Sequence, residues 1–255
     1  MKNIKNQFSK NIDKLQPGIS TSSVVFGFRD NQLHILVSKL KDLNLWMIPT
    51  GYVFTSENIE DSAKRILSGR LGVKKLFLEQ FHTFGNKDRA TSKEENSVLF
   101  AQFSDHPKIQ NWLNQRFISI GYISLVRISD CKLSTDLYSD DVKWAPINDL
   151  PTLILDNASI VKQALNYLKT AYIHLPIAYS LLENKFTMKE VQTLYEQIYN
   201  KTTDRGNFQK RILKLDILKR HEKKMNGNAH RAPFLYSFNQ EKYLKYKALN
   251  QDIMS

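Results

Sequence analysis

The chain has 255 residues, 42% of them hydrophobic and 24% charged, which is ordinary for a soluble globular protein, and its length favours two domains. It lacks an apolar run long enough to span a membrane, and its polar N-terminus does not resemble a signal peptide. Cys131 is the single cysteine, so neither a disulfide framework nor a zinc cluster is expected, and we expect a cytoplasmic protein.

The N-terminal half alternates strand-like and helical patterns. Residues 22–28 and 33–38 are predicted to be strands around a turn at 29–32. A third apolar run, residues 45–48, is expected to stop at Pro49, Thr50 and Gly51. Apolar side chains then recur at helical spacing, and residues 74–84 return to strand-like composition. The helical positions are Ile59, Ala63, Ile66, Leu67 and Leu71.

Residues 90–115 interrupt this alternation with a polar run, an apolar run and a short helix that ends near Gln115. A strand is predicted over 117–128, and another strand ends around 140–146. From Asn157, a plausible cap, a helix with a stripe of Ile160, Ala164, Leu165 and Leu168 is expected, and Pro176 ends it. We place the domain boundary here, with one domain over 1–156 and the other over 157–255.

The C-terminal part predicts two helices and a hairpin. Thr187 and Glu190 have capping-box spacing, and the helix that they open carries an apolar face of Met188, Val191, Leu194, Tyr195 and Ile198. A second helix starts near Asp204 with a stripe of Phe208, Ile212 and Leu215. Two strand-like stretches around Asn226 and Gly227 then predict a basic hairpin.

Positive charge is concentrated in this part of the chain. Residues 201–231 contain ten basic and three acidic residues, which is typical of a surface that binds a polyanion, although a solvated basic face is the alternative. Helix, turn, helix and basic hairpin in this order predict a winged helix that binds double-stranded DNA. RNA binding or a scaffold role is a further alternative. The candidate DNA-binding residues are Arg205, Gly206, Asn207, Lys210, Arg211, Lys214, Lys223, Lys224 and Arg231.

Residues 51–73 resemble a Nudix box, the helix–loop signature of hydrolases that cleave nucleoside diphosphate derivatives. Gly51, Glu57, Arg65, Leu67, Gly72 and Val73 occupy the expected positions. The helix glutamates that hold Mg²⁺ in those enzymes are replaced by Ile66, Gly69 and Arg70. Because a hard cation needs oxygen ligands, we predict that the chain is not an enzyme and needs no metal or cofactor.

The whole chain resembles the Nudix-related transcriptional regulators over roughly residues 20–240, most specifically over 186–215. That family implies an α/β Nudix-like sandwich with a mixed sheet, followed by a C-terminal winged helix-turn-helix domain. Its members respond to ADP-ribose or to sugars such as arabinose, and they dimerise. The matching positions are 83–85 with 88–89, 144–147 with 150–151, 186–187 with 194–196, 204–205 with 207–208, 210–211, 213, and 235–236.

The resemblance implies a ligand-responsive regulator that binds an operator as a homodimer, with a pentose or an ADP-ribose-like molecule as effector. Arg65, Phe84, Asp88 and Arg89 are the candidate effector contacts, although Arg65 could be a structural helix residue and the Asp-Arg pair a plain turn. The rival hypothesis is an active Nudix hydrolase. It would need replacement carboxylates, and Glu57, Glu60 and Asp61 lie at the start of the helix instead.

Overall fold

The computed structural model describes residues 2–89, 101, 103, 105–171, 177–224 and 232–248. The chain divides into two units, each of which is considered by itself. The first contains Met1–Phe26, Ile35–Ser124 and Cys131–Ala164, and the second contains Gly27–His34, Leu125–Asp130 and Leu165–Ser255. The boundary predicted near residue 156 stays a proposal, since the helix that follows it is shared between both units.

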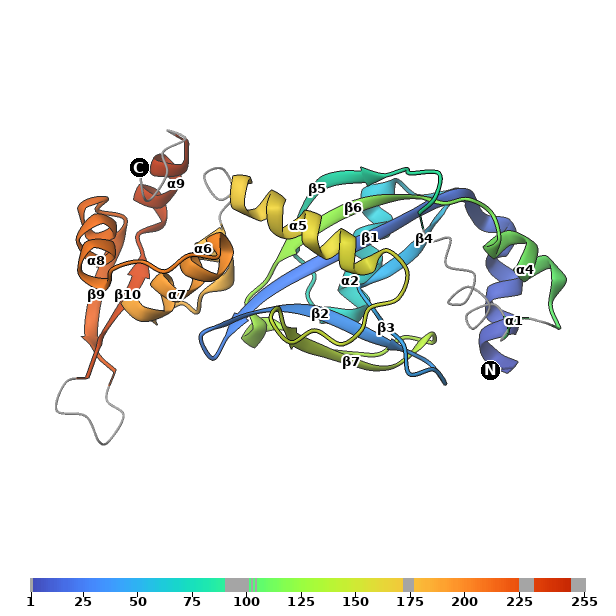
Figure 1. Ribbon diagram of the computed structural model, residues 1–255, viewed down its shortest axis with the longest axis horizontal. Helices are drawn as coiled ribbons and strands as arrows, with labels where there is room; N and C mark the ends of the chain where they lie inside the picture. Colours follow the sequence, from blue (N-terminus) through green and yellow to red (C-terminus); the bar gives the residue numbers. More distant parts are fainter. Residues whose placement is uncertain are drawn as a thin grey trace. The chain divides into compact units, whose positions relative to one another are not determined.

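The first unit is built around a mixed sheet (Figure 1). Among the described residues, seven strands follow the order β3-β2-β1-β6-β5, with β4 paired to β1 and β7 paired to β2. The strands are β1 (Leu15–Arg29), β2 (Gln32–Leu40), β3 (Trp46–Met47), β4 (Thr50–Phe54), β5 (Phe77–Phe84), β6 (Ile118–Leu125) and β7 (Ser139–Pro146).

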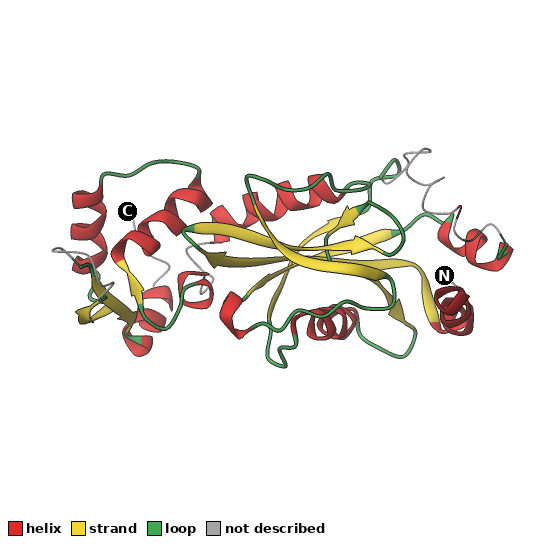
Figure 2. Ribbon diagram, turned by 90° about the horizontal axis from the view of Figure 1, so that it is seen from below, coloured by secondary structure: helices red, strands yellow, loops and turns green. Residues whose placement is uncertain are grey.

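The helices of this unit are α1 (Lys2–Asn11), η1 (Ile12–Lys14), α2 (Ile59–Leu71), α4 (Pro107–Leu113) and α5 (Asn157–Ala171). Figure 2 shows α2 and α5 on opposite faces of the sheet, so the predicted α/β sandwich is confirmed. The helix predicted from the spacing of Ile59 to Leu71 is also confirmed. It ends where Gly72 adopts a left-handed conformation, with φ +66°, and a Cβ there would lie 3.0 Å from the Lys132 carbonyl oxygen.

Two local predictions for this unit need correction. The third apolar run does stop before Thr50, but Thr50 and Gly51 are not a turn: they begin β4, because they pair with Ser22 and Thr21 of β1. Asn157 is not a cap, because its side-chain oxygen accepts a hydrogen bond from the Ile48 amide at 2.9 Å. That bond connects the start of α5 to the segment between β3 and β4.

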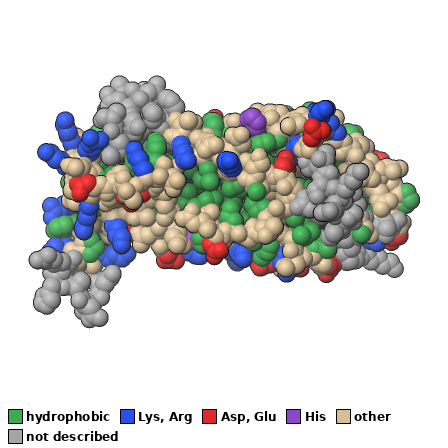
Figure 3. Space-filling view, in the orientation of Figure 1, with side chains coloured by type: hydrophobic (Ala, Val, Ile, Leu, Met, Phe, Trp, Pro, Cys, Tyr) green, Lys and Arg blue, Asp and Glu red, His purple; other side chains and the backbone are tan. Residues whose placement is uncertain are grey.

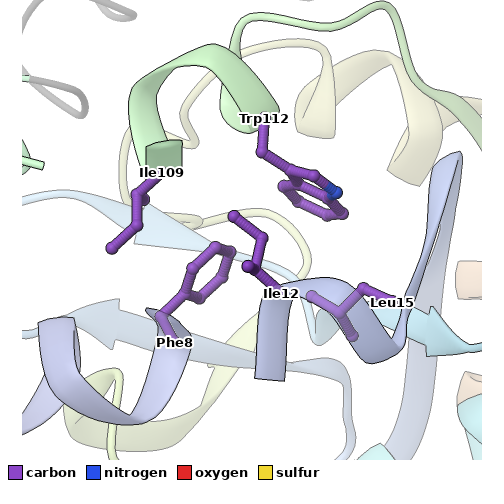
Figure 4. Packing of buried hydrophobic residues seen from close by; sticks show 5 residues of the cluster. All are labelled: Phe8, Ile12, Leu15, Ile109 and Trp112. Atoms are coloured by element: carbon purple, nitrogen blue, oxygen red, sulfur yellow. The ribbon is translucent and has the colours of Figure 1, made fainter. Parts of the chain in front are cut away.

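The N-terminal helix was not predicted from the sequence, yet it contributes to the core. Phe8, Ile12 and Leu15 point toward Ile109 and Trp112 of α4 in one buried cluster (Figure 4). The described part of the 90–115 stretch is therefore packed into this unit. The polar run at 91–96 and the start of the apolar run lie outside the described residues.

The second unit has a small sheet and four α-helices among its described residues. Three strands pair antiparallel in the order β8-β10-β9. Its elements are η2 (Ile128–Asp130), α6 (Ile177–Leu181), β8 (Phe186–Thr187), α7 (Met188–Tyr199), α8 (Arg205–Lys214), β9 (Leu218–Lys223), β10 (Phe234–Phe238) and α9 (Gln240–Ala248).

This arrangement is the predicted winged helix. The apolar face of α7 is buried as expected, and so are Phe208 and Ile212 of α8. The hairpin of β9 and β10 is confirmed, whereas its predicted turn at Asn226 and Gly227 lies outside the described residues, as does Pro176. The short strand β8, which the sequence analysis missed, adds a third strand to the hairpin.

The second unit also contains the tip of the β1–β2 hairpin. Asp30 and Asn31 both have positive φ, 52° and 58°, which is the backbone form of a tight two-residue hairpin turn. The side chain of Gln197 in α7 donates from Nε2 to the Asn31 carbonyl at 2.7 Å and accepts a hydrogen bond from the Leu33 amide. One amide side chain thus holds both sides of the turn.

Candidate functional site: a degenerate Nudix helix, a polar cavity and a basic winged helix

The first part of the candidate site is the Nudix-box helix α2 together with Glu57, which lies just before it. Both carboxylate oxygens of Glu57 accept hydrogen bonds from Arg65, at 2.9 Å from Nε and 2.6 Å from Nη2. Partial burial opposes ionisation of Glu57, but the bonds from Arg65 and from the Phe54 amide hold its pKa below the usual range. Arg65 also donates to the Tyr52 carbonyl at 3.0 Å, so this pair ties α2 to β4.

None of the three positions at which the Nudix pattern has glutamates carries a side-chain oxygen, and the first two are Ile66 and Gly69. Ile66 packs directly on Gly51 of β4, where a Cβ would lie only 2.4 Å from the Ile66 Cδ1 atom. Gly69 is exposed, and nothing lies within 4 Å of the place where its Cβ would be. The isoleucine therefore fills space against the sheet, and the glycine leaves its position open.

The third position reverses the charge that a metal site needs. Arg70 is buried, with 6% exposure, and donates from Nη1 to Ser38 at 2.9 Å and to Ser139 at 3.2 Å. Its Nη2 atom donates to Asp136 at 2.6 Å. Burial lowers the pKa of the Arg70 guanidinium, and Asp136 opposes that effect. A guanidinium in this place repels a divalent cation, so the residues at the three box positions do not fit Mg²⁺.

The second part of the site is a cavity of about 360 Å³ in the first unit, between the end of β5, the loop after it and the first half of α5. This volume lies within the usual range of small-molecule sites. Its walls combine two rings, amides, hydroxyls and charged groups. The lining residues are His82, Thr83, Phe84, Gly85, Asn86, Asp88, Arg89, Asp156, Ser159 and Gln163.

Arg89 and Asp156 form the charged wall of the cavity. The guanidinium donates to the carboxylate twice, from Nε at 2.9 Å and from Nη2 at 3.2 Å, and both side chains are largely buried. The remaining Nη1 atom donates to the Phe117 carbonyl at 2.9 Å. This arrangement fixes the loop after β5 to the start of α5 and to the segment before β6.

The aromatic wall is formed by Phe84 and His82, whose ring centroids lie 4.6 Å apart in an edge-to-face arrangement. Phe84 also lies over Gly121 of β6, where a Cβ would come within 2.7 Å of its ring. Gly121 is therefore required for the ring to lie this close to the sheet. Rings beside amides and hydroxyls are suited to a ligand that combines a base with hydroxyl groups.

The structure brings together three of the four predicted effector residues, because Phe84, Asp88 and Arg89 all line the cavity. Arg65 does not line it, and is held by Glu57 instead. The sequence analysis missed Asp156, Ser159 and Gln163. The last two lie four residues apart on the polar side of α5, opposite its buried stripe, and this spacing was the available signal.

The third part of the site is α8 in the second unit, and both α8 and the helix before it begin at a capping residue. Thr187 and Glu190 form the predicted capping box at the start of α7, and Asp204 caps α8 by accepting from the Asn207 amide at 2.8 Å. Between the helices, Glu196 accepts from the amide and the hydroxyl of Thr203, at 2.7 and 2.8 Å. Burial opposes ionisation of Glu196, but these bonds hold its pKa below the usual range.

The predicted recognition residues of α8 are all exposed. At about 100° per residue, Gly206, Asn207, Lys210 and Lys214 lie away from the buried stripe of Phe208 and Ile212, whereas Arg211 lies at its edge and Arg205 is exposed at the helix start. Lys and Arg side chains gather over α8, β9 and β10 in Figure 3. The exposed residues of the predicted set are Arg205, Gly206, Asn207, Lys210, Arg211 and Lys214.

The hairpin supplies further cations. Lys223 and Lys224 are exposed at the end of β9, as predicted. Arg220, which the sequence analysis did not single out, lies 3.5 Å from the centre of the Phe234 ring, and this contact joins β9 to β10. Arg231 lies outside the described residues.

Comparison with known proteins agrees with this geometry. Residues 178–238 match the family model of the NrtR DNA-binding winged helix domain. The chain is 23% identical to the ADPR responsive transcriptional repressor NtrR of Acinetobacter baylyi, over 96% of this chain and 94% of that protein.

Solved structures show the same fold. Shewanella oneidensis NrtR in complex with a 27mer DNA superposes with a TM-score of 0.65 and 23% identity, over 88% of this chain and 94% of that one. A MutT/nudix family protein from Enterococcus faecalis gives a TM-score of 0.60 at 17% identity, over 92% and 93% of the two chains. A Nudix-like α/β domain followed by a winged helix is therefore the fold of this chain. None of its described helices is long and apolar enough to cross a membrane.

Proposed function

We propose that this chain is a member of the NrtR-like family of Nudix-related regulators, and that it is a transcriptional repressor controlled by an ADP-ribose-type metabolite. The observation that carries the proposal is the exposed face of α8, where a glycine, an amide and several cations lie together beside a basic hairpin. In a winged helix this face enters the major groove, where Asn can pair with adenine and Arg or Lys with guanine.

The cavity beside Arg89 is the proposed effector site. The two rings can stack on a base, while the amides and hydroxyls of the α5 wall can bind ribose hydroxyls. The Acinetobacter relative is described as ADPR responsive, which supports ADP-ribose over a free pentose as the effector. The guanidinium of Arg89 is already paired with Asp156, so we do not assign the diphosphate to it.

A thermal-shift titration with ADP-ribose, adenosine, ribose and arabinose tests this assignment. ADP-ribose is expected to raise the Tm of the full-length protein, adenosine to raise it less, and the free pentoses to leave it unchanged. A shift with arabinose or ribose but none with ADP-ribose would mean that the protein senses a sugar.

We propose further that the Nudix-like unit binds its ligand without hydrolysing it. The support is the packing of Ile66 on Gly51 and the pairing of Arg70 with Asp136 at two box positions. Purified protein with Mg²⁺ or Mn²⁺ is expected to leave ADP-ribose intact. Metal-dependent turnover that disappears in Glu57→Gln would support the rival hydrolase hypothesis instead.

The DNA partner is proposed to be an inverted-repeat operator bound by a homodimer, since two copies of a winged helix present two half-sites. Footprinting on DNA fragments selected from the source genome, together with light scattering of the complex, tests this point. Protection of a single unrepeated site by a monomer contradicts it.

A further inference from the structure

A leucine on the exposed face of α8 is only partly covered by the second unit. The Leu213 side chain is 42% exposed, whereas Phe208 and Ile212 on the same helix are completely buried. A single exposed leucine is common on protein surfaces and needs no explanation by itself. Its position relative to the other exposed residues of α8 is what matters here.

Leu213 lies on the same line along the helix as Gly206. Seven residues separate them, which at 100° per residue places their side-chain directions within about 20° of each other and about 10.5 Å apart along the axis. Lys210 lies between them, and Asn207 and Lys214 lie to one side. Gly206, Lys210 and Leu213 therefore share one side of the exposed face, and Asn207 and Lys214 lie beside them.

The fold does not require a glycine at position 206. Gly206 is not among the glycines with positive φ, and a Cβ there would meet only the Asp204 Oδ1 atom, at an ordinary 3.4 Å. A glycine weakens a helix relative to alanine, so its presence here is unfavourable for the isolated unit. Contacts within the second unit therefore explain neither the glycine at position 206 nor the exposed part of Leu213.

We propose that Leu213 contacts the 5-methyl group of a thymine in the operator, while Gly206 lets the helix backbone approach the floor of the same major groove. The thymine methyl is the apolar group that the major groove displays, and apolar side chains recognise it by contact. An axial separation of about 10.5 Å corresponds to about three base-pair steps. The inference rests on the proposed function, in which α8 reads duplex DNA.

Uracil substitution removes the proposed contact without altering hydrogen bonding. Duplexes are selected from a random library with the full-length protein, and each thymine of the selected site is then replaced in turn by uracil. Wild-type protein is expected to lose about fourfold in affinity at one thymine per half-site, the amount that one buried methyl group contributes. Leu213→Ala is expected to bind the thymine and uracil duplexes equally at that position and to keep the wild-type profile elsewhere.

Leu244→Ala is the matched control, because Leu244 is 55% exposed and lies in α9, outside the reading helix. It is expected to keep the wild-type uracil profile. Gly206→Ala provides a second, independent test. We expect this variant to have a higher Tm than wild type and at least a tenfold higher Kd for the selected duplex, a combination that a purely structural glycine would not give.

The outcomes separate the inference from the proposed function. If the wild-type protein selects no sequence at all, the proposed function fails and the inference fails with it. If it selects a site but the uracil penalties are the same in wild type and Leu213→Ala, only the inference is overturned. A selected site without an invariant thymine also overturns it. So does a Leu213→Ala variant that keeps the wild-type uracil profile but changes its oligomeric state, because Leu213 would then contact protein and not DNA.

Discussion

Arg70 of the Nudix-box helix donates a 2.6 Å hydrogen bond from Nη2 to Oδ2 of Asp136, at a position where the hydrolase pattern has a metal-binding glutamate. The guanidinium is buried and is also bonded to Ser38 and Ser139, so it joins α2 to β2 and β7. The arginine at this position therefore does more than remove a possible metal ligand. It has become a structural connection that a glutamate could not make.

Restoring the glutamates one at a time should therefore have opposite effects on stability. Arg70→Glu places a carboxylate beside Asp136 without a counter-charge and should lower the free energy of unfolding by about 3 kcal/mol or more. Gly69→Glu is the matched control, since its position is open, and it should raise the free energy of unfolding by about 0.5 kcal/mol. Urea unfolding measures both. Equal stability of the two variants would contradict the role assigned to Arg70.

The cavity wall predicts a second pair of variants. Arg89→Ala leaves the largely buried Asp156 carboxylate without its partner and should cost about 3 kcal/mol of stability. Arg89→Lys keeps the charge but loses the two-point contact, so it should cost about 1 kcal/mol. If isothermal titration shows that Arg89→Lys binds ADP-ribose as tightly as wild type, the effector does not depend on this wall.

Stability should also depend on pH through Glu196, which holds the turn before α8. Its folded-state pKa is lowered, so its contribution is complete above the ordinary value of 4.5 and is lost as the pH falls through the folded-state pKa. Glu196→Gln should therefore be less stable than wild type at neutral pH, and the difference should shrink below pH 4.5. A difference that stays constant from pH 3 to pH 7 would exclude this explanation.

DNA affinity should distinguish the helix from the hairpin. Asn207→Ala should cost about 1–3 kcal/mol of binding and relax specificity at one base pair. Lys223→Ala or Lys224→Ala should weaken binding to all sequences alike and reduce the slope of log Kd against log salt by about one per lost phosphate contact. Fluorescence anisotropy on the selected duplex and on random DNA provides the comparison. Equal, sequence-independent losses in both classes would mean that α8 does not read bases.

Local sequence patterns were sufficient for the helices that position the site. The bounds of α2 follow from the apolar spacing that starts at Ile59, and the start of α7 follows from the capping box of Thr187 and Glu190. Both signals are contained within a few neighbouring residues, so they do not depend on what the helix packs against. The exposed face of α8 could be predicted for the same reason.

Features that depend on distant segments could not be predicted in this way. The cavity forms because Asp156 and Gln163, just before and within α5, lie beside the loop that carries Arg89, and no local pattern in the sequence indicates that these segments meet. Asn157 was expected to cap its own helix, but its side-chain oxygen accepts a hydrogen bond from the Ile48 amide, 109 residues away. The cluster of Phe8 and Trp112 was missed likewise, because each residue lies in a short segment with weak periodicity of its own.

The central claim is that effector binding and operator binding are coupled, and one titration measures this directly. Full-length protein is bound to its selected duplex, and the Kd for DNA is determined by anisotropy with and without saturating ADP-ribose. We predict a change of at least about fivefold, and by thermodynamic linkage the duplex must change the Kd for ADP-ribose by the same factor. A Kd for DNA that is identical with and without bound ADP-ribose would contradict the account.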